Sequence, residues 1–371
     1  MSFSEIVHPD FRLNGVPLEG SFDRFMRAVS RTFPQRQRDA DFLADIEDFL
    51  RQYLDDTPTV VCHTSGSTGK PKDLPIEKSR MRASARMTCR YFGLEAGTRA
   101  LLCLPIKYIA GRMMLVRALT RGWDLHAVTP SSRPLEHAPE GRFDFAAWVP
   151  VQLYESVGDI PRVRKILVGG GSVDKRFLDS LSGCDLPADT AIYQSYAMTE
   201  TITHVAVRRL FPQGESVYTA LEGVRFSLSA AESTLTVDAP AVAPRPVETR
   251  DVAELLDERH FIWRGRADTV INSGGIKLFP EDTEALLSGA LPPGRYFVAG
   301  VPDARLGQRQ VLFVEGKEGD FPHLEQYLAE HFDAYHRPKQ TVFTTRFEQT
   351  ATGKTDRRAV VARFSESSEP F

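Results

Sequence analysis

The chain has few cysteines, no long apolar run and no excess of charge of one sign. Its four cysteines among 371 residues have no Cys-x-x-Cys spacing, so a zinc ribbon and a disulfide framework are both excluded. No apolar stretch approaches the roughly 18 residues that span a bilayer, and the amino-terminal segment lacks the basic and apolar regions of a signal peptide. Lysine and arginine number 46 against 49 aspartates and glutamates, which excludes the basic field of a nucleic-acid-binding protein. We therefore expect a cytoplasmic protein with reduced core thiols, no membrane insertion, no nucleic-acid partner and a small molecule as ligand.

What the chain does contain is the composition of an ordinary globular protein, with 42% hydrophobic and 26% charged residues. Strand, loop and helix patterns alternate up to about residue 220, including a strand at 59–63 and a helix at 78–92. This alternation is typical of the α/β class, in which helices flank a parallel or mixed sheet. Short alternating strands then predict a small β-rich subdomain, and about 100 further residues predict a separate α+β domain. We predict an N-terminal domain at residues 1–267 and a C-terminal domain at 268–371.

A polar, glycine-rich segment, HTSGSTGKPK at residues 63–72, follows the strand predicted at 59–63. Its glycines allow a tight turn that brings backbone N–H groups to an anion, and its hydroxyl and ammonium groups supply further donors, which suits a polyphosphate. The segment is not a Walker A loop, because Thr64 stands where that motif needs glycine and Pro71 where it needs serine or threonine. On composition alone, a plain solvated turn is the alternative.

The same segment resembles, position by position, the [ST]-[SG]-G-[ST]-T-G-x-P-K signature of the adenylate-forming superfamily. That superfamily contains acyl-CoA and aryl-CoA synthetases, luciferases and the adenylation domains of peptide synthetases. The resemblance implies that the loop binds the phosphates of ATP. The residues implied in this contact are Thr64, Ser65, Gly66, Ser67, Thr68, Gly69, Lys70 and Lys72.

A second motif, QSYAMTE at residues 194–200, resembles the Y-G-x-T-E motif of the superfamily, with Ala197 in place of the usual glycine. The resemblance implies that Tyr196 stacks on adenine, that Thr199 binds the α-phosphate and that Glu200 holds Mg²⁺. These residue types suit those roles, because an aromatic ring can stack and a carboxylate is a preferred ligand of a hard cation. Taken alone, the motif is equally consistent with a strand end followed by a helix that Thr199 caps.

Two further motifs follow in the order that the superfamily has. Thr249-Arg250-Asp251 resembles T-G-D, which implies that Asp251 accepts hydrogen bonds from the ribose hydroxyls, although arginine replaces the middle glycine. The segment WRGRAD at 263–268 resembles the G-R-x-D hinge. This resemblance implies that Arg266 contacts ribose or phosphate and that Asp268 is the pivot of a mobile C-terminal domain.

The C-terminal motifs imply two half-reactions. The glycine loop with Gly274 and Gly275 resembles the segment that lies near the path of the thiol. Lys354, in TATGKTDR at 350–357, resembles the lysine that serves adenylate formation. A lone Gly-Lys pair near a chain end is ordinarily a solvated turn, and the position of Lys354 well after the hinge motif is what favours the catalytic role.

Two segments, at residues 195–204 and 104–112, resemble one group within the superfamily. This group is the short bacterial o-succinylbenzoate-CoA ligases of menaquinone biosynthesis. That acid carries a second carboxylate on an aromatic ring, so its pocket needs a cation and an apolar slot. Lys107 and Arg112 are the candidate cations, and Gly169, Gly170 and Gly171 are candidates to make room for the ring. The alternatives are a surface pair beside a helix and an ordinary strand-to-helix turn.

The resemblance therefore predicts an enzyme that uses ATP, Mg²⁺ and CoA to convert a small-molecule carboxylic acid, through its acyl-adenylate, into a CoA thioester. A second interpretation has the acyl group delivered to the phosphopantetheine of a carrier protein, and a third is a non-catalytic nucleotide-binding protein. The phosphate loop begins near residue 63, earlier than in longer members, so we expect a shortened N-terminal region. No oligomeric state follows from the sequence.

Overall fold

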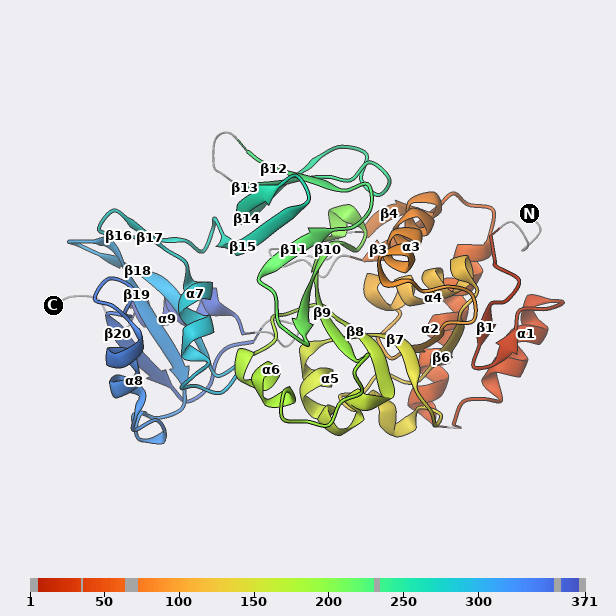
Figure 1. The fold of residues 1–371 in the computed structure, drawn as a ribbon, viewed down its shortest axis with the longest axis horizontal. Coiled ribbons are helices and arrows are strands. Elements are labelled where there is room, and N and C mark those ends of the chain that lie inside the picture. The colour runs from red at the N-terminus through yellow and green to blue at the C-terminus, as the bar shows by residue number, and fades with distance from the viewer. Residues whose placement is uncertain (1–5, 35, 64–72, 230–233, 350–354, 367–371) are drawn as a thin grey trace.

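The computed structural model describes residues 6–34, 36–63, 73–229, 234–349 and 355–366. A large mixed sheet with its helices lies toward the N-terminal end of the molecule, and a smaller sheet with three helices lies toward the C-terminal end (Figure 1). The α/β class predicted from the sequence is confirmed. Within the described ranges, no helix combines the length and apolar character needed to cross a bilayer.

Thirteen strands form the large sheet, and most of them are short, as expected for a twisted mixed sheet. They are β1 (Arg12–Leu13), β2 (Val16–Pro17), β5 (Arg99–Leu102), β6 (Asp124–Ala127), β7 (Phe143–Trp148), β8 (Val163–Val168), β9 (Ala191–Ala197), β10 (His204–Phe211), β11 (Val217–Ala220), β12 (Arg225–Leu228), β13 (Thr234–Asp238), β14 (Val247–Asp257) and β15 (His260–Arg266).

The sheet order is β12-β13-β14-β15-β11-β10-β9-β8-β7-β5-β6-β1-β2. The strands from β9 to β1 in this order run parallel to one another, whereas those from β9 to β12 pair antiparallel. The central parallel strands β5, β7 and β8 have consecutive buried apolar residues, because helices cover both sides of a parallel sheet. The antiparallel strands β12 to β15 are the β-rich region that the sequence predicts after about residue 221, whereas the antiparallel strands β10 and β11 precede it.

Helices cover the two faces of the parallel strands with separate apolar cores. One core gathers side chains from the first four helices, such as Phe49, Met81 and Met113, and the other gathers Leu153 and Leu181. The helices are α1 (Phe22–Ser30), α2 (Gln37–Leu54), α3 (Lys78–Phe92), α4 (Ile109–Arg121), α5 (Pro150–Glu155) and α6 (Lys175–Leu181).

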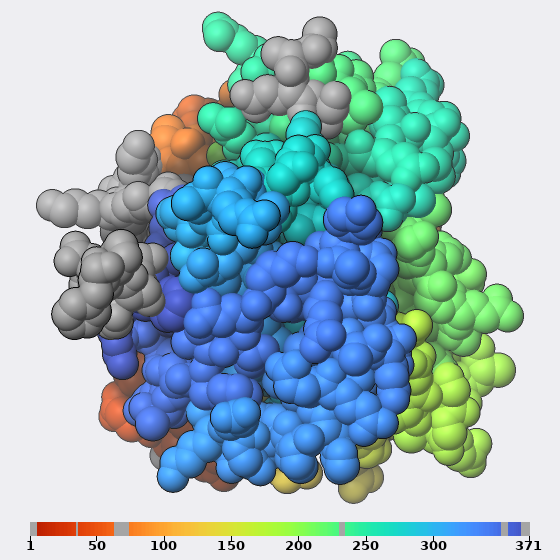
Figure 2. Space-filling view, turned by 90° about the vertical axis from the view of Figure 1, so that its left-hand side faces the viewer, coloured from red at the N-terminus to blue at the C-terminus, as the bar shows by residue number. Residues whose placement is uncertain are grey.

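The C-terminal part is a second sheet in the order β17-β16-β19-β18, with β20 parallel to β19. Separate apolar clusters lie around Leu312 and around Phe313, because neighbouring residues of a strand point to opposite faces of the sheet. Figure 2 shows the C-terminal part, in blue, at the centre of the face toward the viewer. The elements are β16 (Ile271–Ser273), β17 (Ile276–Leu278), α7 (Pro280–Leu287), β18 (Tyr296–Asp303), β19 (Gly307–Glu315), α8 (Leu324–His331), β20 (Gln340–Thr344) and α9 (Arg357–Glu366).

The cysteines are all free, and one of them departs from the prediction of core thiols. Cys62, Cys89 and Cys103 are buried, and burial raises the pKa of Cys89 and of Cys103 to about 12 in each case. Cys184 is exposed, so its assignment to the core was wrong. It lies in the irregular segment after α6, where the chain turns at the surface before β9.

Candidate active site

Two of the predicted segments, Gly169–Gly171 and the motif at 194–200, meet at the carboxyl ends of β8 and β9. These strands are parallel neighbours, so the residues that follow them lie at the same edge of the sheet. Ser195 Oγ donates to Val168 O at 3.0 Å, and Gln194 Nε2 donates to Gly171 O at 2.9 Å. A Cβ on Gly169 would lie 3.0 Å from Ser195 Oγ, so a side chain there would crowd β9. The structure therefore brings the stretch Gly169–Gly171 against the strand that carries Tyr196.

Tyr196, Asp251 and Arg266 form one cluster although they lie far apart in the sequence. The Tyr196 hydroxyl donates to Asp251 Oδ2 at 2.6 Å, and Trp263 Nε1 donates to Asp251 Oδ1 at 3.2 Å. Arg266 Nη1 lies 3.8 Å from Asp251 Oδ1, because β14 and β15 pair Asp251 with Arg266. Burial, followed by the charge of Asp251, raises the pKa of Tyr196, so the phenol stays a neutral donor. The binding of ribose by Asp251 stays a prediction.

The ring of Tyr196 is buried among protein aromatics. Its centroid lies 5.1 Å from that of Phe261 and 5.8 Å from that of Tyr218, both in edge-on geometry, and Tyr218 and Phe261 stack on each other. Only 9% of Tyr196 is exposed. These contacts hold the ring rigidly. Stacking on adenine stays a prediction, and it would have to use the small part of the ring that solvent reaches.

Replacing Tyr196 with phenylalanine is expected to lower the free energy of unfolding by about 1–2 kcal/mol, because the acceptor Asp251 loses the hydrogen bond that the Tyr196 hydroxyl donates. The KM for ATP is expected to rise in the same variant if Asp251 holds the ribose. Thermal melting and initial-rate kinetics measure the two effects. Tyr193→Phe is the matched control, since Tyr193 is half-buried on the same strand and its hydroxyl has no hydrogen bond within the described residues. Equal behaviour of the two variants would contradict the prediction.

Glu200 presents a free carboxylate beyond the end of β9. It lies in a short 3₁₀ turn at Thr199–Thr201, is exposed, and has no hydrogen bond or ion pair to any described residue. No cluster of three or more His, Cys, Asp or Glu side chains placed for a metal occurs in the part of the chain that the structure describes. A single exposed carboxylate fits Mg²⁺, which keeps several waters and takes its other ligands from substrate phosphates. It does not fit a structural zinc ion.

The turn that carries Glu200 ends in a strained backbone. Ile202 has φ 68° and ψ −58°, which is unfavourable for a β-branched residue, and the N–H of Thr203 donates to Thr201 O at 2.7 Å across it. The Thr201 hydroxyl donates to Thr203 O at 2.8 Å and closes the same turn. Such strain persists only where surrounding contacts hold it, and it concentrates at functional sites. This geometry supports the roles of Thr199 and Glu200, which stay predictions.

A buried arginine that the sequence analysis did not single out lies behind this turn. Arg117, on α4, is 3% exposed and has no acidic partner within the described residues. Its Nη2 donates to Thr203 Oγ1 at 3.4 Å, its Nη1 lies 3.7 Å from Met114 Sδ, and its Nε has no partner in those residues. Burial lowers the pKa of Arg117 to about 10, so the group is still a cation near neutral pH. The signal in the sequence was an arginine inside an apolar helix, where charged residues are rare.

The donor and the acceptor of each hydrogen bond around Arg117 can be assigned consistently. Thr88 donates its proton to Ser84 O at 3.1 Å, so its oxygen accepts from His204 Nε2 at 3.3 Å. His204 Nδ1 then accepts from the Thr203 hydroxyl at 3.2 Å, which leaves the Thr203 oxygen to accept from Arg117. Burial and the charge of Arg117 hold the pKa of His204 well below its usual value, so the ring is neutral. The guanidinium therefore stands as a cation among neutral groups.

The two cations predicted for the acid pocket lie in different environments. Lys107 is exposed, with Nζ 5.2 Å from the centroid of the Tyr108 ring. Arg112 is 8% exposed and donates to two backbone carbonyls, from Nε to Ile106 O at 2.8 Å and from Nη1 to Val61 O at 2.6 Å. Arg112 therefore ties the strand before the phosphate loop to the start of α4. Acid recognition by either residue stays a prediction.

The predicted hinge lies at the end of β15. Arg266 Nε donates to Asp268 Oδ1 at 2.9 Å, and this contact holds the pKa of Asp268 below its usual range. Gly274 and Gly275, at φ 58° and 87°, form the turn between β16 and β17. This left-handed conformation costs glycine little, which explains the pair of glycines. The roles of Asp268 as pivot and of the glycines in the thiol path stay predictions.

A half-buried carboxyl beside the hinge gives a pH-dependent prediction. Glu281 Oε1 accepts from Thr269 Oγ1 at 3.0 Å, Oε2 has no partner within the described residues, and burial raises the pKa of Glu281. A carboxyl whose folded pKa exceeds its ordinary value of 4.5 binds more protons in the folded state, so stability falls as pH rises from 4.5 through the folded value. Glu281→Gln is therefore expected to raise the melting temperature near pH 7 and not below about pH 4. The exposed Glu318→Gln is the control, and a lower melting temperature for Glu281→Gln near pH 7 would contradict the prediction.

Two predicted elements of the site lie outside the described residues. They are the phosphate loop from Thr64 to Lys72 and the predicted catalytic Lys354. The loop joins β3 (Thr59–His63) to β4 (Asp73–Glu77), an antiparallel pair in which His63 lies opposite Asp73. The C-terminal motif is flanked by a β-bridge between Gln349 and Thr355. The roles of the loop and of Lys354 stay predictions.

Comparison with known proteins places this chain in a family. Residues 28–228 match the AMP-binding enzyme family, and residues 295–354 match the AMP-binding enzyme C-terminal domain. Because the first match covers more than half of the chain, the chain belongs to the AMP-binding enzyme family. Relatives named as CoA ligases and acyl-CoA synthetases narrow this class to the AMP-forming acid–CoA ligases.

Three relatives illustrate the similarity. The probable 2-succinylbenzoate–CoA ligase of Mycobacterium tuberculosis is 27% identical over 351 residues, covering 85% of this chain and 86% of that protein. The crystal structure of an acyl-CoA synthetase (AMP-forming)/AMP-acid ligase II-like protein from Dyadobacter fermentans is 34% identical with a TM-score of 0.59, covering 91% of this chain and 97% of that chain. The o-succinylbenzoate coenzyme A synthetase of Bacillus subtilis, solved with ATP and magnesium, is 20% identical with a TM-score of 0.67, covering 80% of this chain and 68% of that chain, and shares the fold.

Proposed function

We propose that this AMP-forming acid–CoA ligase acts on o-succinylbenzoate. The acid carboxylate would attack the α-phosphorus of ATP, forming the acyl-adenylate and releasing pyrophosphate. The thiol of CoA would then displace AMP and give o-succinylbenzoyl-CoA. The observation that carries the choice of acid is Arg117, a buried cation with no acidic partner in the described residues, which lies directly behind the turn of Glu200.

A buried cation without a counter-charge is costly, and a bound carboxylate would remove that cost. An acid with a second carboxylate supplies such a group, and a guanidinium can bind it with charge-assisted hydrogen bonds. The neutral His204 and the hydroxyls of Thr88 and Thr203 fix the guanidinium without neutralising it. The glycines after β8 carry no side chain beside β9, where a Cβ on Gly169 would crowd Ser195, and this suits the close approach of a flat ring. The M. tuberculosis relative, named for the same acid, also supports the choice.

The remaining residues would serve the nucleotide chemistry. Asp251, oriented by Tyr196 and Trp263, would accept hydrogen bonds from the ribose hydroxyls. Thr199 and the loop from Thr64 to Lys72 would bind the phosphates. Mg²⁺, held by Glu200 and substrate phosphates, would neutralise charge on the transferring group. Lys354 would hold the carboxylate near the α-phosphate, and we further propose that the C-terminal domain, residues 268–371, moves about Asp268 between the two steps.

The test is AMP formation with a panel of acids, with and without CoA. The panel contains o-succinylbenzoate, benzoate and indoleacetate, so that the second carboxylate is the main variable. We expect kcat/KM to be highest for o-succinylbenzoate and AMP release to be fast only with CoA. Preference for a monocarboxylic acid would overturn the choice of substrate. Acyl-adenylate formation without turnover of free CoA would instead favour a carrier protein as acceptor.

A further inference from the structure

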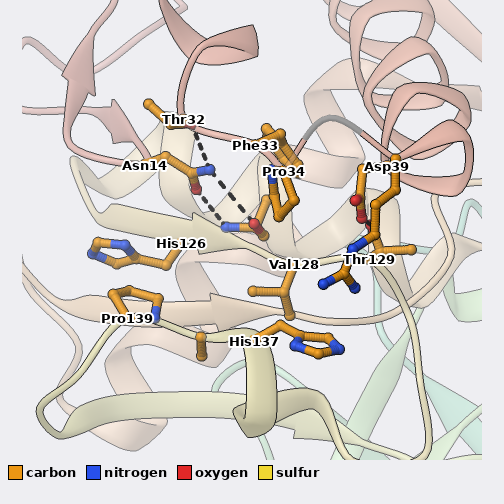
Figure 3. A pocket seen from close by; sticks show the side chains of 13 residues that line it. Asn14, Thr32, Phe33, Pro34, Asp39, His126, Val128, Thr129, His137 and Pro139 are labelled. Atoms are coloured by element: carbon orange, nitrogen blue, oxygen red, sulfur yellow. Dashed lines mark hydrogen bonds between the residues drawn. The ribbon is translucent and has the colours of Figure 1, made fainter.

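A cavity lies away from the candidate active site, at the carboxyl end of β6. Its volume is about 450 Å³, which is within the range of small-molecule sites. β6 is four strand positions from β9 in the sheet order, or roughly 19 Å at the usual strand spacing. Its walls come from the turn after β1, the segment between α1 and α2, the end of β6, and the short 3₁₀ helix at Pro134–His137 with the residues after it. Figure 3 shows the side chains that line it.

A buried carboxylate is the main polar feature of this cavity. Asp39 is 4% exposed; its Oδ1 accepts a short hydrogen bond from the Thr129 hydroxyl, and its Oδ2 has no partner among the described residues. Asp39 lies in the first turn of α2, where the helix dipole favours a negative charge. A buried carboxylate oxygen without a donor is costly, so a bound group that donates to Oδ2 would be stabilised. The unpartnered oxygen selects an ammonium or another N–H donor.

Two donors line the same end of the cavity. Arg36, three residues before Asp39, is exposed and forms no ion pair with any described residue. His137 Nε2 lies 3.4 Å from Arg38 Nη2, and since a guanidinium only donates, Nε2 accepts and Nδ1 carries the proton of the neutral ring. Figure 3 shows Asp39, Thr129 and His137 on one side of the cavity, with Asn14 and His126 on the other. An anionic group on the same ligand as the ammonium would therefore find hydrogen-bond donors at this end of the cavity.

The rest of the cavity offers apolar contact. Phe33, Pro34 and Val128 line it between the two polar ends, and Pro139 lies beside His126 (Figure 3). At the far end the Asn14 amide is already paired, because Oδ1 accepts from Ala127 N at 2.7 Å and Nδ2 donates to Thr32 Oγ1 at 2.9 Å. The cavity thus combines an acceptor and donors at one end with an apolar body. We propose that it binds an α-amino acid with an apolar side chain, with its ammonium on Asp39 and its carboxylate toward Arg36 and His137.

The test is isothermal titration calorimetry of the full chain with L-phenylalanine, L-leucine and L-methionine. For ligands of this size we expect a Kd in about the millimolar range or tighter for at least one of them. Asp39→Asn is expected to weaken binding about 10- to 100-fold, since it removes a charge-assisted hydrogen bond, and Arg36→Gln by less than about fivefold, since Arg36 is exposed. The matched control is Asp41→Asn, an exposed aspartate on the same helix, which should bind as the unmodified chain does.

Two further probes test whether the cavity binds both the ammonium and the carboxylate of the amino acid. 2-Phenylethylamine carries only the ammonium and 3-phenylpropionate only the carboxylate, and each is expected to bind more weakly than phenylalanine. Should Asp39→Asn fail to fold, perturbation of the His137 ring signals in NMR spectra of the unmodified chain during titration with phenylalanine decides the question. The proposal is overturned by absence of binding of all three amino acids at about 20 mM, by unchanged affinity of Asp39→Asn, or by equal binding of 2-phenylethylamine.

Discussion

Replacing Arg117 with methionine is expected to lower kcat/KM for o-succinylbenzoate by roughly 10²-fold or more, because removing one partner of a buried charge pair typically costs 2–5 kcal/mol. Methionine keeps most of the apolar volume of the side chain, so the loss reports the charge. The same variant is expected to melt at the same temperature as the unmodified enzyme or higher, since a buried cation without a counter-charge is removed. Acid-dependent AMP release and thermal melting measure the two effects.

The combination of lost activity and retained stability separates recognition of the acid from a structural role. Arg121→Met is the matched control, because Arg121 lies one turn further along α4 and pairs with Glu95 at the surface. Benzoate is the substrate control, since it lacks the second carboxylate and its reaction should change little in Arg117→Met. A variant that loses benzoate and o-succinylbenzoate activity equally, or that melts several degrees lower, would show that Arg117 serves the fold.

Replacing Lys354 with alanine is expected to slow adenylate formation about 10²- to 10³-fold, the usual cost of removing a positioned group that stabilises charge in the transition state. Attack of the acid on ATP brings two anions together, so an ammonium between them acts mainly on this step. The transfer of the acyl group from supplied acyl-adenylate to CoA is expected to stay within a fewfold of the unmodified rate. ATP–pyrophosphate exchange measures the first step, and thioester formation measures the second.

Lys317→Ala is the control for loss of a surface lysine from the same part of the chain, because Lys317 is exposed. It should leave both steps unchanged. Equal loss of both half-reactions in Lys354→Ala would contradict the assignment of this lysine to adenylate formation. Full retention of exchange would show that another cation holds the carboxylate.

Several elements of the fold could be predicted from local sequence. The strand at 59–63 and the helix at 78–92 have the predicted bounds, because the proline before the strand and the glycine after the helix mark their ends locally. The change from a parallel to an antiparallel sheet follows the change from strands alternating with helices to short consecutive strands. The family could also be predicted from short motifs, since the functional residues of each motif lie within about ten positions of one another.

Long-range contacts were not predictable in this way. The Tyr196–Asp251 hydrogen bond joins residues 55 positions apart, and the sequence analysis assigned each a separate ligand. Arg112 donates to backbone carbonyls from two segments, which its place in the sequence did not indicate, and its role toward the acid stays a prediction. In the sequence Arg117 is one residue of an apolar helix, and its burial without an acidic partner among the described residues appeared only in the tertiary structure.

The sequence by itself determined the class of chemistry and the residue types that perform it, because backbone propensity and short motifs act over a few neighbouring residues. The tertiary structure alone decided which of those side chains share an environment. Among the described residues, it buried Arg117 without a counter-charge, paired Tyr196 with Asp251, and left one oxygen of Asp39 without a partner in a cavity away from the candidate active site. Burial and partner choice depend on residues far along the chain, and these set the energy of a charge in a protein.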